Sequence, residues 1–286
     1  MNRILVIGGT GHVGREVVSQ LTAAGAPVRA MVRNPDGAGL PPEIEVVRGD
    51  LTLPETLDGC LEGIDSVFLV WTAPADAAAP AFERIAKQAR RIVYLSAPIK
   101  TQHPLFQKSQ PNRSAAMHLQ NEKLIEDSGL AWTFLRPGMF SLNCAGWWAP
   151  QIRAGDVVRW PYAEAPTAPV DERDIAAVAV RVLLENGHDR ADYILTGSES
   201  LSQAEQVAII GRAIGRSLRM QEISPDEAER ELSTVIPAPV VKYLIKAWEG
   251  AVGQPAYITS TIEQITGSPA RPFLTWANDN AAAFRA

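Results

Sequence analysis

The chain has 286 residues, of which 46% are hydrophobic and 21% are charged, so it can bury a substantial core. Its 27 basic and 32 acidic residues give a net charge of -5, which argues against a nucleic-acid-binding or membrane-surface protein. No apolar run approaches the roughly 20 residues that span a bilayer. No signal peptide is recognised before the first strand, so we expect a cytoplasmic protein.

Short apolar, β-branched runs alternate with helical patterns through the first half of the chain. The predicted strands are Ile4–Ile7, Val28–Val32, Ile44–Val47, Val67–Val70, Ile92–Leu95 and Trp132–Leu135. The predicted helices lie near 12–24, 54–60, 80–89 and 114–128. Continuous apolar runs are typical of parallel strands covered on both faces. The sequence therefore predicts an α/β fold with a doubly wound parallel sheet of the Rossmann type.

The pattern changes near residue 140. The stretch Trp147–Pro169 is rich in Trp and Pro, and we expect it to form loop and pocket wall. Further on, helices are predicted after Asp171, Ser202 and Ser224, and strands at Tyr193–Thr196 and Leu218–Ile223. We expect residues 1–140 to form the nucleotide-binding core. Residues 141–286 would form a smaller α/β substrate-binding region interleaved with it.

A glycine-rich loop, Gly8-Gly-Thr-Gly11-His-Val-Gly14, follows the first predicted strand directly and opens the first helix. This is the context that the dinucleotide fingerprint requires, although the spacing is G-x-x-G-x-x-G rather than G-x-G-x-x-G. Backbone N–H groups and the helix dipole would favour phosphates there. A tight turn without a ligand is the alternative. We expect cofactor contacts from Gly8, Thr10, Gly11, His12, Val13 and Gly14, with His12 lining the phosphates.

The end of the second predicted strand indicates which dinucleotide binds. An acid at this place commonly holds the ribose hydroxyls of NAD, whereas here Arg33 follows the strand. A guanidinium can bind a 2′-phosphate through two parallel hydrogen bonds, so we expect NADPH. The alternative for Arg33 is a solvated charge. Asp50, with Leu51 beside it, can accept a hydrogen bond from the adenine amino group or can serve as a turn residue.

Together these segments resemble the NmrA-like branch of the atypical short-chain dehydrogenases/reductases. The resemblance is carried by Ile4–Gly14, Val32–Asn34, Gly49–Leu51, Val93–Ala97 and Glu122–Pro137, and more loosely by the tail from Phe273 to Phe284. It implies a Rossmann core, a small substrate region and, in many members, a preference for NADPH. It does not imply one activity, because the family includes quinone and dye reductases, isoflavone-reductase-like enzymes and regulators that sense the cofactor.

Ordinary short-chain dehydrogenases use a Tyr-x-x-x-Lys pair as proton donor, and no tyrosine of this chain has Lys four residues later. Counted along the predicted helix 114–128, Ser114 falls near the usual Tyr position and His118 near the usual Lys position. His118 can orient the nicotinamide ribose or relay a proton. Ser96 ends the fifth predicted strand, where it can bond cofactor or substrate. For all three residues, an ordinary structural role is the alternative.

Other residues are expected to border the nicotinamide or the substrate. Trp71 and Thr72 follow the fourth predicted strand, and Pro137 follows the sixth, where the resemblance implies a backbone near the nicotinamide. Aromatic residues beyond this point could sandwich a flat substrate or could simply fill the core: Phe140, Trp147, Trp148 and Trp160. The sequence shows no metal-ligand cluster and no G-x-S-x-G hydrolase motif.

The sequence therefore supports an NADPH-dependent reductase that transfers a hydride to a small, conjugated or aromatic acceptor such as a quinone, enone, carbonyl or imine. An electron-poor acceptor needs little acid help, which fits the missing Tyr. A cofactor-sensing protein without turnover fits the same absence. We expect a small-molecule substrate, and a homodimer is compatible with the sequence.

Overall fold

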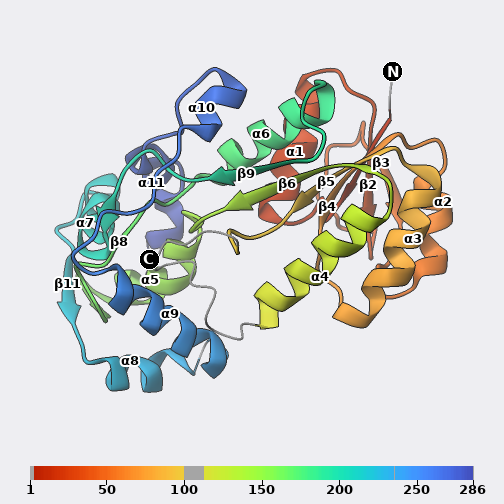
Figure 1. The fold of residues 1–286 in the computed structure, drawn as a ribbon. Helices are drawn as coiled ribbons and strands as arrows, with labels where there is room; N and C mark the ends of the chain where they lie inside the picture. Colours follow the sequence, from red (N-terminus) through yellow and green to blue (C-terminus); the bar gives the residue numbers. More distant parts are fainter. Residues whose placement is uncertain (1–2, 100–112, 235, 286) are drawn as a thin grey trace.

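The computed structural model describes residues 3–99, 113–234 and 236–285, with Arg113 and Ser114 described by backbone only. Its centre is a seven-stranded sheet in the order β3-β2-β1-β4-β5-β6-β9, in which every neighbouring pair is parallel (Figure 1). The strands are β1 (Ile4–Ile7), β2 (Val28–Val32), β3 (Glu45–Arg48), β4 (Ser66–Val70), β5 (Arg91–Leu95), β6 (Ala131–Pro137) and β9 (Ala191–Leu195). The expected doubly wound parallel sheet is confirmed.

Helices cover both faces of this sheet, which explains why its strands are apolar on both sides. One layer consists of α2 (Leu57–Leu61), α3 (Ala78–Gln88) and α4 (Arg113–Asp127), and the other of α1 (His12–Ala23) and α6 (Glu172–Leu184). Alternate residues of β5 enter the two cores: Ile92 and Tyr94 face the α3 and α4 layer, whereas Val93 and Leu95 face α1 and α6.

The C-terminal half contributes to both parts of the molecule. Helix α6 and strand β9 complete the central sheet and its helix layer. Most of the other elements form a second cluster beyond the arrowhead of β6: α5 (Asn143–Ala154), β7 (Val157–Trp160), β8 (Pro166–Thr167), β10 (Leu201–Ser202), α7 (Gln203–Ile214), β11 (Arg219–Glu222), α8 (Pro225–Leu232), α9 (Ala238–Ala251) and α11 (Phe273–Asp279). Helix α10 (Thr261–Thr266) instead packs on α6 and β9, where Ile262 joins the core of the central sheet. The predicted domain boundary at residue 140 stays a prediction. Two elements beyond it, α6 and β9, belong to the central sheet and its helix layer.

The expectation of loop for Trp147–Pro169 is wrong, since this stretch contains most of α5 together with β7 and β8. Cys144, Trp148 and Ile152 are spaced four apart and fully buried, so one helical face packs into the core. That burial outweighs the helix-breaking effect of Pro150, which lies exposed inside α5.

The predicted helix starts agree with the structure. Asp171 caps α6, and Ser202 begins α7 with a reciprocal capping box to Glu205. The Ser224 hydroxyl accepts from the backbone of Glu227 at the start of α8. Helix α7 ends at Gly215, which has the left-handed conformation typical of a C-terminal cap.

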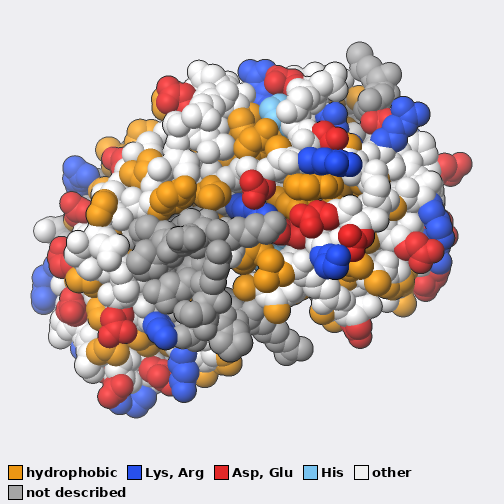
Figure 2. All heavy atoms as spheres, viewed as in Figure 1, with side chains coloured by type: hydrophobic (Ala, Val, Ile, Leu, Met, Phe, Trp, Pro, Cys, Tyr) orange, Lys and Arg blue, Asp and Glu red, His pale blue; other side chains and the backbone are white. Residues whose placement is uncertain are grey.

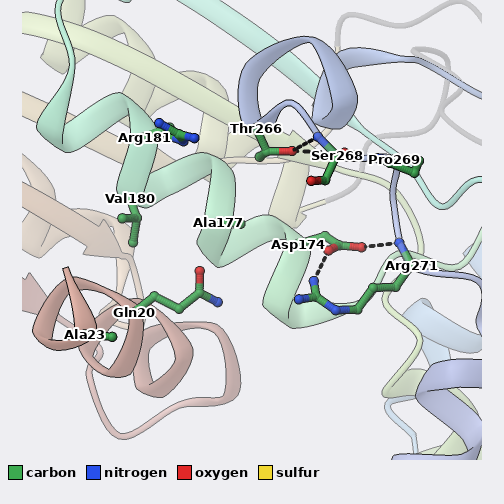
Figure 3. Close-up of a pocket in the computed structure, with 10 residues that line it drawn as sticks. All are labelled: Gln20, Ala23, Asp174, Ala177, Val180, Arg181, Thr266, Ser268, Pro269 and Arg271. Atoms are coloured by element: carbon green, nitrogen blue, oxygen red, sulfur yellow. Dashed lines mark hydrogen bonds and ion pairs between the residues drawn. The ribbon is translucent and has the colours of Figure 1, made fainter.

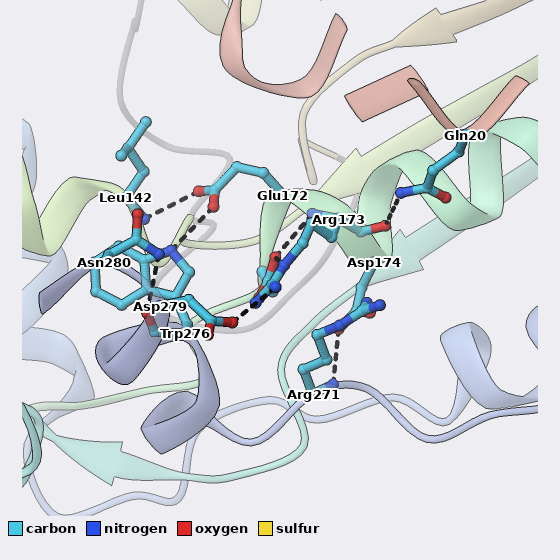
Figure 4. Close-up of polar contacts among 10 residues, drawn as sticks. Gln20, Leu142, Glu172, Arg173, Asp174, Arg271, Trp276, Asp279 and Asn280 are labelled. Atoms are coloured by element: carbon cyan, nitrogen blue, oxygen red, sulfur yellow. Dashed lines mark hydrogen bonds and ion pairs between the residues drawn. The ribbon is translucent and has the colours of Figure 1, made fainter. Parts of the chain in front are cut away.

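The first turn of α6 joins the two parts of the molecule through three consecutive side chains (Figure 4). The Glu172 carboxylate accepts hydrogen bonds from the Leu142 amide at 3.0 Å and from the Trp276 indole at 3.2 Å. Arg173 pairs with Asp279 at 2.8 Å, and Asp174 pairs with Arg271. These contacts hold α5, α11 and the segment before α11 against the central sheet.

Candidate functional site

Because all seven strands run parallel, the residues that follow them gather at one edge of the sheet. The positions directly after β1, β2, β4, β5 and β6 there are Gly8, Arg33, Trp71, Ser96 and Gly138, and Asp50 lies two residues after β3. Strands β1 and β4 are neighbours at the point where the strand order reverses. Ligands of such sheets bind in the crevice at that reversal, so the fold brings the predicted residues to the expected place.

The glycine loop connects β1 to α1 with very little space between them. Gly8 has a φ of +92°, which favours glycine, and a Cβ built on Gly14 would lie 2.1 Å from the Gly8 carbonyl oxygen. Helix α1 begins after Gly11 with no side-chain cap and no acidic residue in its first turn. The amides of this turn lack intrahelical partners. The loop therefore presents free N–H groups at a positive helix end, which fits a pyrophosphate.

The other loop positions differ in exposure. Thr10, Gly11 and His12 are exposed, whereas Val13 is buried against the sheet. Val13 can therefore contribute its backbone amide to a ligand but not its side chain.

Arg15 is a loop-organising residue that the sequence analysis missed. Its guanidinium donates to the carbonyl oxygens of Thr10, Ala38 and Gly39 at 2.9, 2.8 and 2.7 Å. One side chain thus ties the glycine loop to the segment that follows β2. A cation directly after the glycine loop gives no distinctive sequence signal, because its acceptors are backbone carbonyls, one of them 23 residues away.

Arg33 and Asp50 lie on neighbouring strand ends. Arg33 is exposed, as a group that binds a solvent-borne phosphate must be. The Asp50 carboxylate accepts from the Thr52 amide and the Thr52 hydroxyl, both at 2.8 Å, and these bonds hold the pKa of Asp50 below its usual value. The nearby Arg33 lowers that pKa further. Asp50 therefore has the turn role that the sequence left open. Leu51 beside it is buried.

Ser96 belongs to a buried ionic network below the sheet edge. The Ser96 hydroxyl donates to Glu122 on α4 at 2.6 Å, and Glu122 pairs with Arg136 on β6 at 2.6 Å. The side chains of Glu122 and Arg136 are 2% and 1% exposed, so the pair lies out of contact with water. Arg136 also bonds the Ala97 carbonyl oxygen and Asp192. This network fixes α4 against the ends of β5, β6 and β9.

His118 lies on α4 near the same edge. Its Nδ1 is 2.7 Å from the hydroxyl of Tyr94, which is buried on β5, and that hydroxyl also accepts from Asn121 at 3.0 Å. Burial lowers the pKa of His118, with Glu122 raising it and Arg136 lowering it. Burial also raises the pKa of Tyr94 far above its usual value. The side chain of Ser114, expected one turn before His118, lies outside the described residues.

The remaining residues predicted to border the cofactor lie at the ends of β4 and β6. Trp71 is buried and stacks on Phe82, with its indole N–H unpaired within the described chain, while Thr72 is exposed. Pro137 ends β6 and is buried. Residues that border a ligand at the carboxyl edge of the sheet would lie at these positions.

The four predicted pocket aromatics separate into two kinds. Trp148 and Trp160 have no exposed surface, and the Trp160 indole donates to Gln203 at 2.7 Å. Full burial shows that this pair fills the C-terminal core, where Trp160 packs on Trp248. Phe140 and Trp147 are half-buried, so they retain surface that a substrate can contact.

A pocket of about 560 Å³ lies on the helix side of the molecule, between α1, α6 and the segment after α10 (Figure 3). Its lining includes Gln20, Arg181 and the Asp174–Arg271 ion pair. None of the predicted site residues lines it, so it is separate from the sheet edge.

Two kinds of feature are absent from the described residues. These residues contain no group of three or more His, Cys, Asp or Glu side chains arranged to hold a metal ion. No helix in the described part of the chain is both long and apolar enough to cross a bilayer. The face drawn in Figure 2 carries acidic and basic side chains intermingled with apolar ones.

Comparison with known proteins gives the family. Residues 8–186 match the sequence profile of the NAD(P)H-binding family. The chain belongs to this family. It is 40% identical to a (4-alkanoyl-5-oxo-2,5-dihydrofuran-3-yl)methyl phosphate reductase of Streptomyces griseus, with 98% of this chain and 99% of that one covered. It is 33% identical to an NAD(P)H azoreductase of Xenophilus azovorans, with 99% of each chain covered.

The solved structure of an NmrA variant shares the fold, with a TM-score of 0.76 and 16% identity over 99% of this chain and 96% of that one. The expected resemblance to NmrA-like proteins is thus confirmed at the level of the fold. The NAD(P)H-binding family and the two reductase relatives make the chain an NAD(P)H-dependent oxidoreductase. The predicted cofactor is confirmed at the level of NAD(P)H binding.

We predict that Gly14→Ala destabilises the protein by about 1–3 kcal/mol, the usual cost of forcing a methyl group into a packed site. The new Cβ would meet the Gly8 backbone, so α1 must move and NADPH affinity must fall with it. Thermal unfolding and calorimetric titration measure both effects. Gly59→Ala is the control, because its Cβ would meet nothing within 4 Å. Equal behaviour of the two variants would contradict the close packing described here.

We also predict that Arg136→Met destabilises the protein by about 3–5 kcal/mol, since it removes the arginine that pairs with the buried Glu122 carboxylate. Chemical denaturation measures this loss. Lys123→Met removes an exposed ion pair with Asp127 from the same helix and should leave the unfolding midpoint unchanged. A small effect of Arg136→Met would contradict the structural role given to this buried pair.

Proposed function

We propose that the protein is an NADPH-dependent reductase that transfers a hydride to a small conjugated acceptor bound at the carboxyl edge of the sheet. The observation that carries the proposal is the arrangement of that edge. A phosphate-binding glycine turn, an exposed arginine after β2 and a half-buried histidine on α4 all lie along it. When NADPH is bound, its nicotinamide supplies the hydride.

The preference for NADPH rests on Arg33. It stands where an acid would bind the ribose hydroxyls of NAD, and its exposed guanidinium can pair with a 2′-phosphate. The neighbouring Asp50 is held in its turn, because its Oδ1 accepts both hydrogen bonds from Thr52. The amides at the start of α1 would hold the pyrophosphate, with Arg15 keeping the adjoining loop in place.

Two observations support a conjugated acceptor: the missing tyrosine proton donor and the substrates for which the relatives are named. No Tyr-x-x-x-Lys pair is present to protonate an unactivated carbonyl. The two relatives are named for an acylated dihydrofuranone and for azo compounds, in which conjugation can spread the incoming negative charge. In this chain His118 would hydrogen-bond the developing anion, and water would deliver the proton. The balance is one hydride and one proton added per acceptor.

The substrate would lie between the end of β6 and the start of the C-terminal cluster. Phe140 and Trp147 have exposed surface there, and Trp147 is itself supported by stacking on Trp160. A flat acceptor could pack on these rings while Ser96 and His118 approach its polar atoms. The cytoplasm remains the predicted location, and a homodimer remains compatible with the sequence.

The reductase proposal predicts turnover with at least one member of a panel containing a quinone, an azo dye and an acyl-substituted unsaturated lactone. Loss of NADPH absorbance should match the acceptor consumed one for one. Saturable NADPH binding without turnover of any member would instead favour a cofactor sensor.

The cofactor proposal predicts that Arg33→Asp weakens NADPH binding by about 10–100-fold and leaves NADH binding within about threefold, because only NADPH loses a charge-assisted phosphate contact. Competition titrations with both nucleotides measure the two affinities. Arg219→Asp changes an exposed arginine on β11 in the same way and should affect neither. Equal weakening of NADPH and NADH would remove Arg33 from the 2′-phosphate site.

A further inference from the structure

Tyr94 is a buried tyrosine that neither the motifs nor the family resemblance single out. It lies on β5 with no exposed surface, so it cannot touch a substrate. Its hydroxyl, however, contacts two residues of α4, namely His118 at 2.7 Å and Asn121 at 3.0 Å. The contact with His118 links the inner face of the sheet to the side chain that the proposed function places at the reacting edge.

The hydrogen-bonding rules for these three groups determine where the hydrogen of the histidine lies. Asn121 Nδ2 donates to the Tyr94 oxygen, which therefore acts as an acceptor in that bond. The hydroxyl has one hydrogen of its own, and among the described residues His118 Nδ1 is the acceptor within reach. A buried hydroxyl that failed to donate would lose a hydrogen bond. Tyr94 therefore donates to Nδ1, and a neutral His118 must carry its hydrogen on Nε2.

We propose that Tyr94 is a positioning residue, which holds His118 in the tautomer with its hydrogen on Nε2 and presents that N–H to the substrate or the ribose. Within the described part of the chain, Nε2 has no hydrogen-bond partner, and His118 is only half-buried. The ring is thus anchored on its inner side and available on its outer side. This inference rests on the proposed function of His118 and adds the residue that orients it.

The charges around His118 agree with a neutral ring. Burial lowers the pKa of His118, and of the two charged groups nearby, Glu122 raises that pKa while Arg136 lowers it. Glu122 is already paired with Arg136 at 2.6 Å, so its charge is largely compensated. Burial keeps Tyr94 protonated, because it raises the pKa of the phenol. Tyr94 can therefore remain a donor throughout the working pH range.

A neutral imidazole suits the acceptor chemistry proposed above. An N–H group aimed at an oxygen that gains negative charge stabilises the transition state without transferring its proton. The tautomer matters because the opposite one would place a lone pair on Nε2, facing the developing anion. Fixing the tautomer through the other ring nitrogen is the usual way in which proteins orient a functional histidine.

The chain supplies a matched control. Tyr193 on β9 makes the same kind of contact, with its hydroxyl 2.8 Å from Nδ1 of His188. That pair lies on the other face of the sheet, because Tyr193 packs against the core under α1 and α6 whereas Tyr94 packs in the core under α3 and α4. Tyr193→Phe therefore removes an equivalent tyrosine–histidine bond without touching the proposed site.

The first test is nitrogen NMR of the uniformly labelled full chain, which distinguishes the two neutral tautomers of each histidine. The His118 signals are assigned by their loss in His118→Gln. We expect the Nε2–H tautomer in the unaltered protein and a mixture of tautomers in Tyr94→Phe, with His118 unchanged in Tyr193→Phe. If the Asn121 amide were reversed, its oxygen would accept from Tyr94, and His118 would carry its hydrogen on Nδ1. A dominant Nδ1–H tautomer in the unaltered protein would therefore overturn the proposal. So would an unchanged tautomer in Tyr94→Phe.

The second test uses the reductase assay. Tyr94→Phe should lower kcat about tenfold with little change in the KM for NADPH, as expected for one lost orienting hydrogen bond. In a His118→Gln background, Tyr94→Phe should cause no further loss, because it acts through the ring. Equal losses in both backgrounds would overturn the role of Tyr94. Failure of His118→Gln to affect kcat would reject the proposed function of His118, while the NMR result would still decide the tautomer.

Discussion

The close contact between Gly14 and Gly8 is the constraint on which the rest of the site depends. Since no side chain fits between them, α1 packs directly on the end of β1 and its first turn points at the edge where the parallel strands end. Val13, Val17 and Val18 then bury the helix against the sheet. A backbone held in this way offers its amides without any side chain that must be ordered on binding, which suits a phosphate ligand.

A second constraint positions the other side of the site. Glu122 and Arg136 form an ion pair with almost no exposure to water, and Ser96 and the Ala97 carbonyl oxygen complete its hydrogen bonds. Such a pair contributes little net stability compared with apolar packing, but it permits only one alignment of α4 with β5 and β6. His118 is thereby kept within reach of Tyr94. The glycine turn fixes α1, and this network fixes α4. Together they hold the two regions proposed to bind the cofactor and the substrate along one edge of the sheet.

Much of the fold could be predicted from the sequence, because its signals are local. The strand runs, the helix caps at Asp171, Ser202 and Ser224, and the glycine turn each depend on neighbouring residues. Trp147–Pro169 was misjudged because Trp and Pro composition says nothing about the helical spacing of Cys144, Trp148 and Ile152. The burial of Trp148 and Trp160 likewise depends on residues far along the chain. The roles of Arg15, Tyr94 and Arg136 were missed for the same reason, since their partners come from other elements.

The measurement that bears most directly on this account is calorimetric titration of the purified full chain with NADPH, with quenching of tryptophan emission followed in parallel. We expect saturable one-to-one binding in the micromolar range, weaker for NADH, because the turn would hold the pyrophosphate and Arg33 would add a contact to the 2′-phosphate that only NADPH carries. If neither heat nor quenching appears at millimolar NADPH, the loop at Gly8–Gly14 is only a packing device, and the reductase function assigned to this edge is wrong.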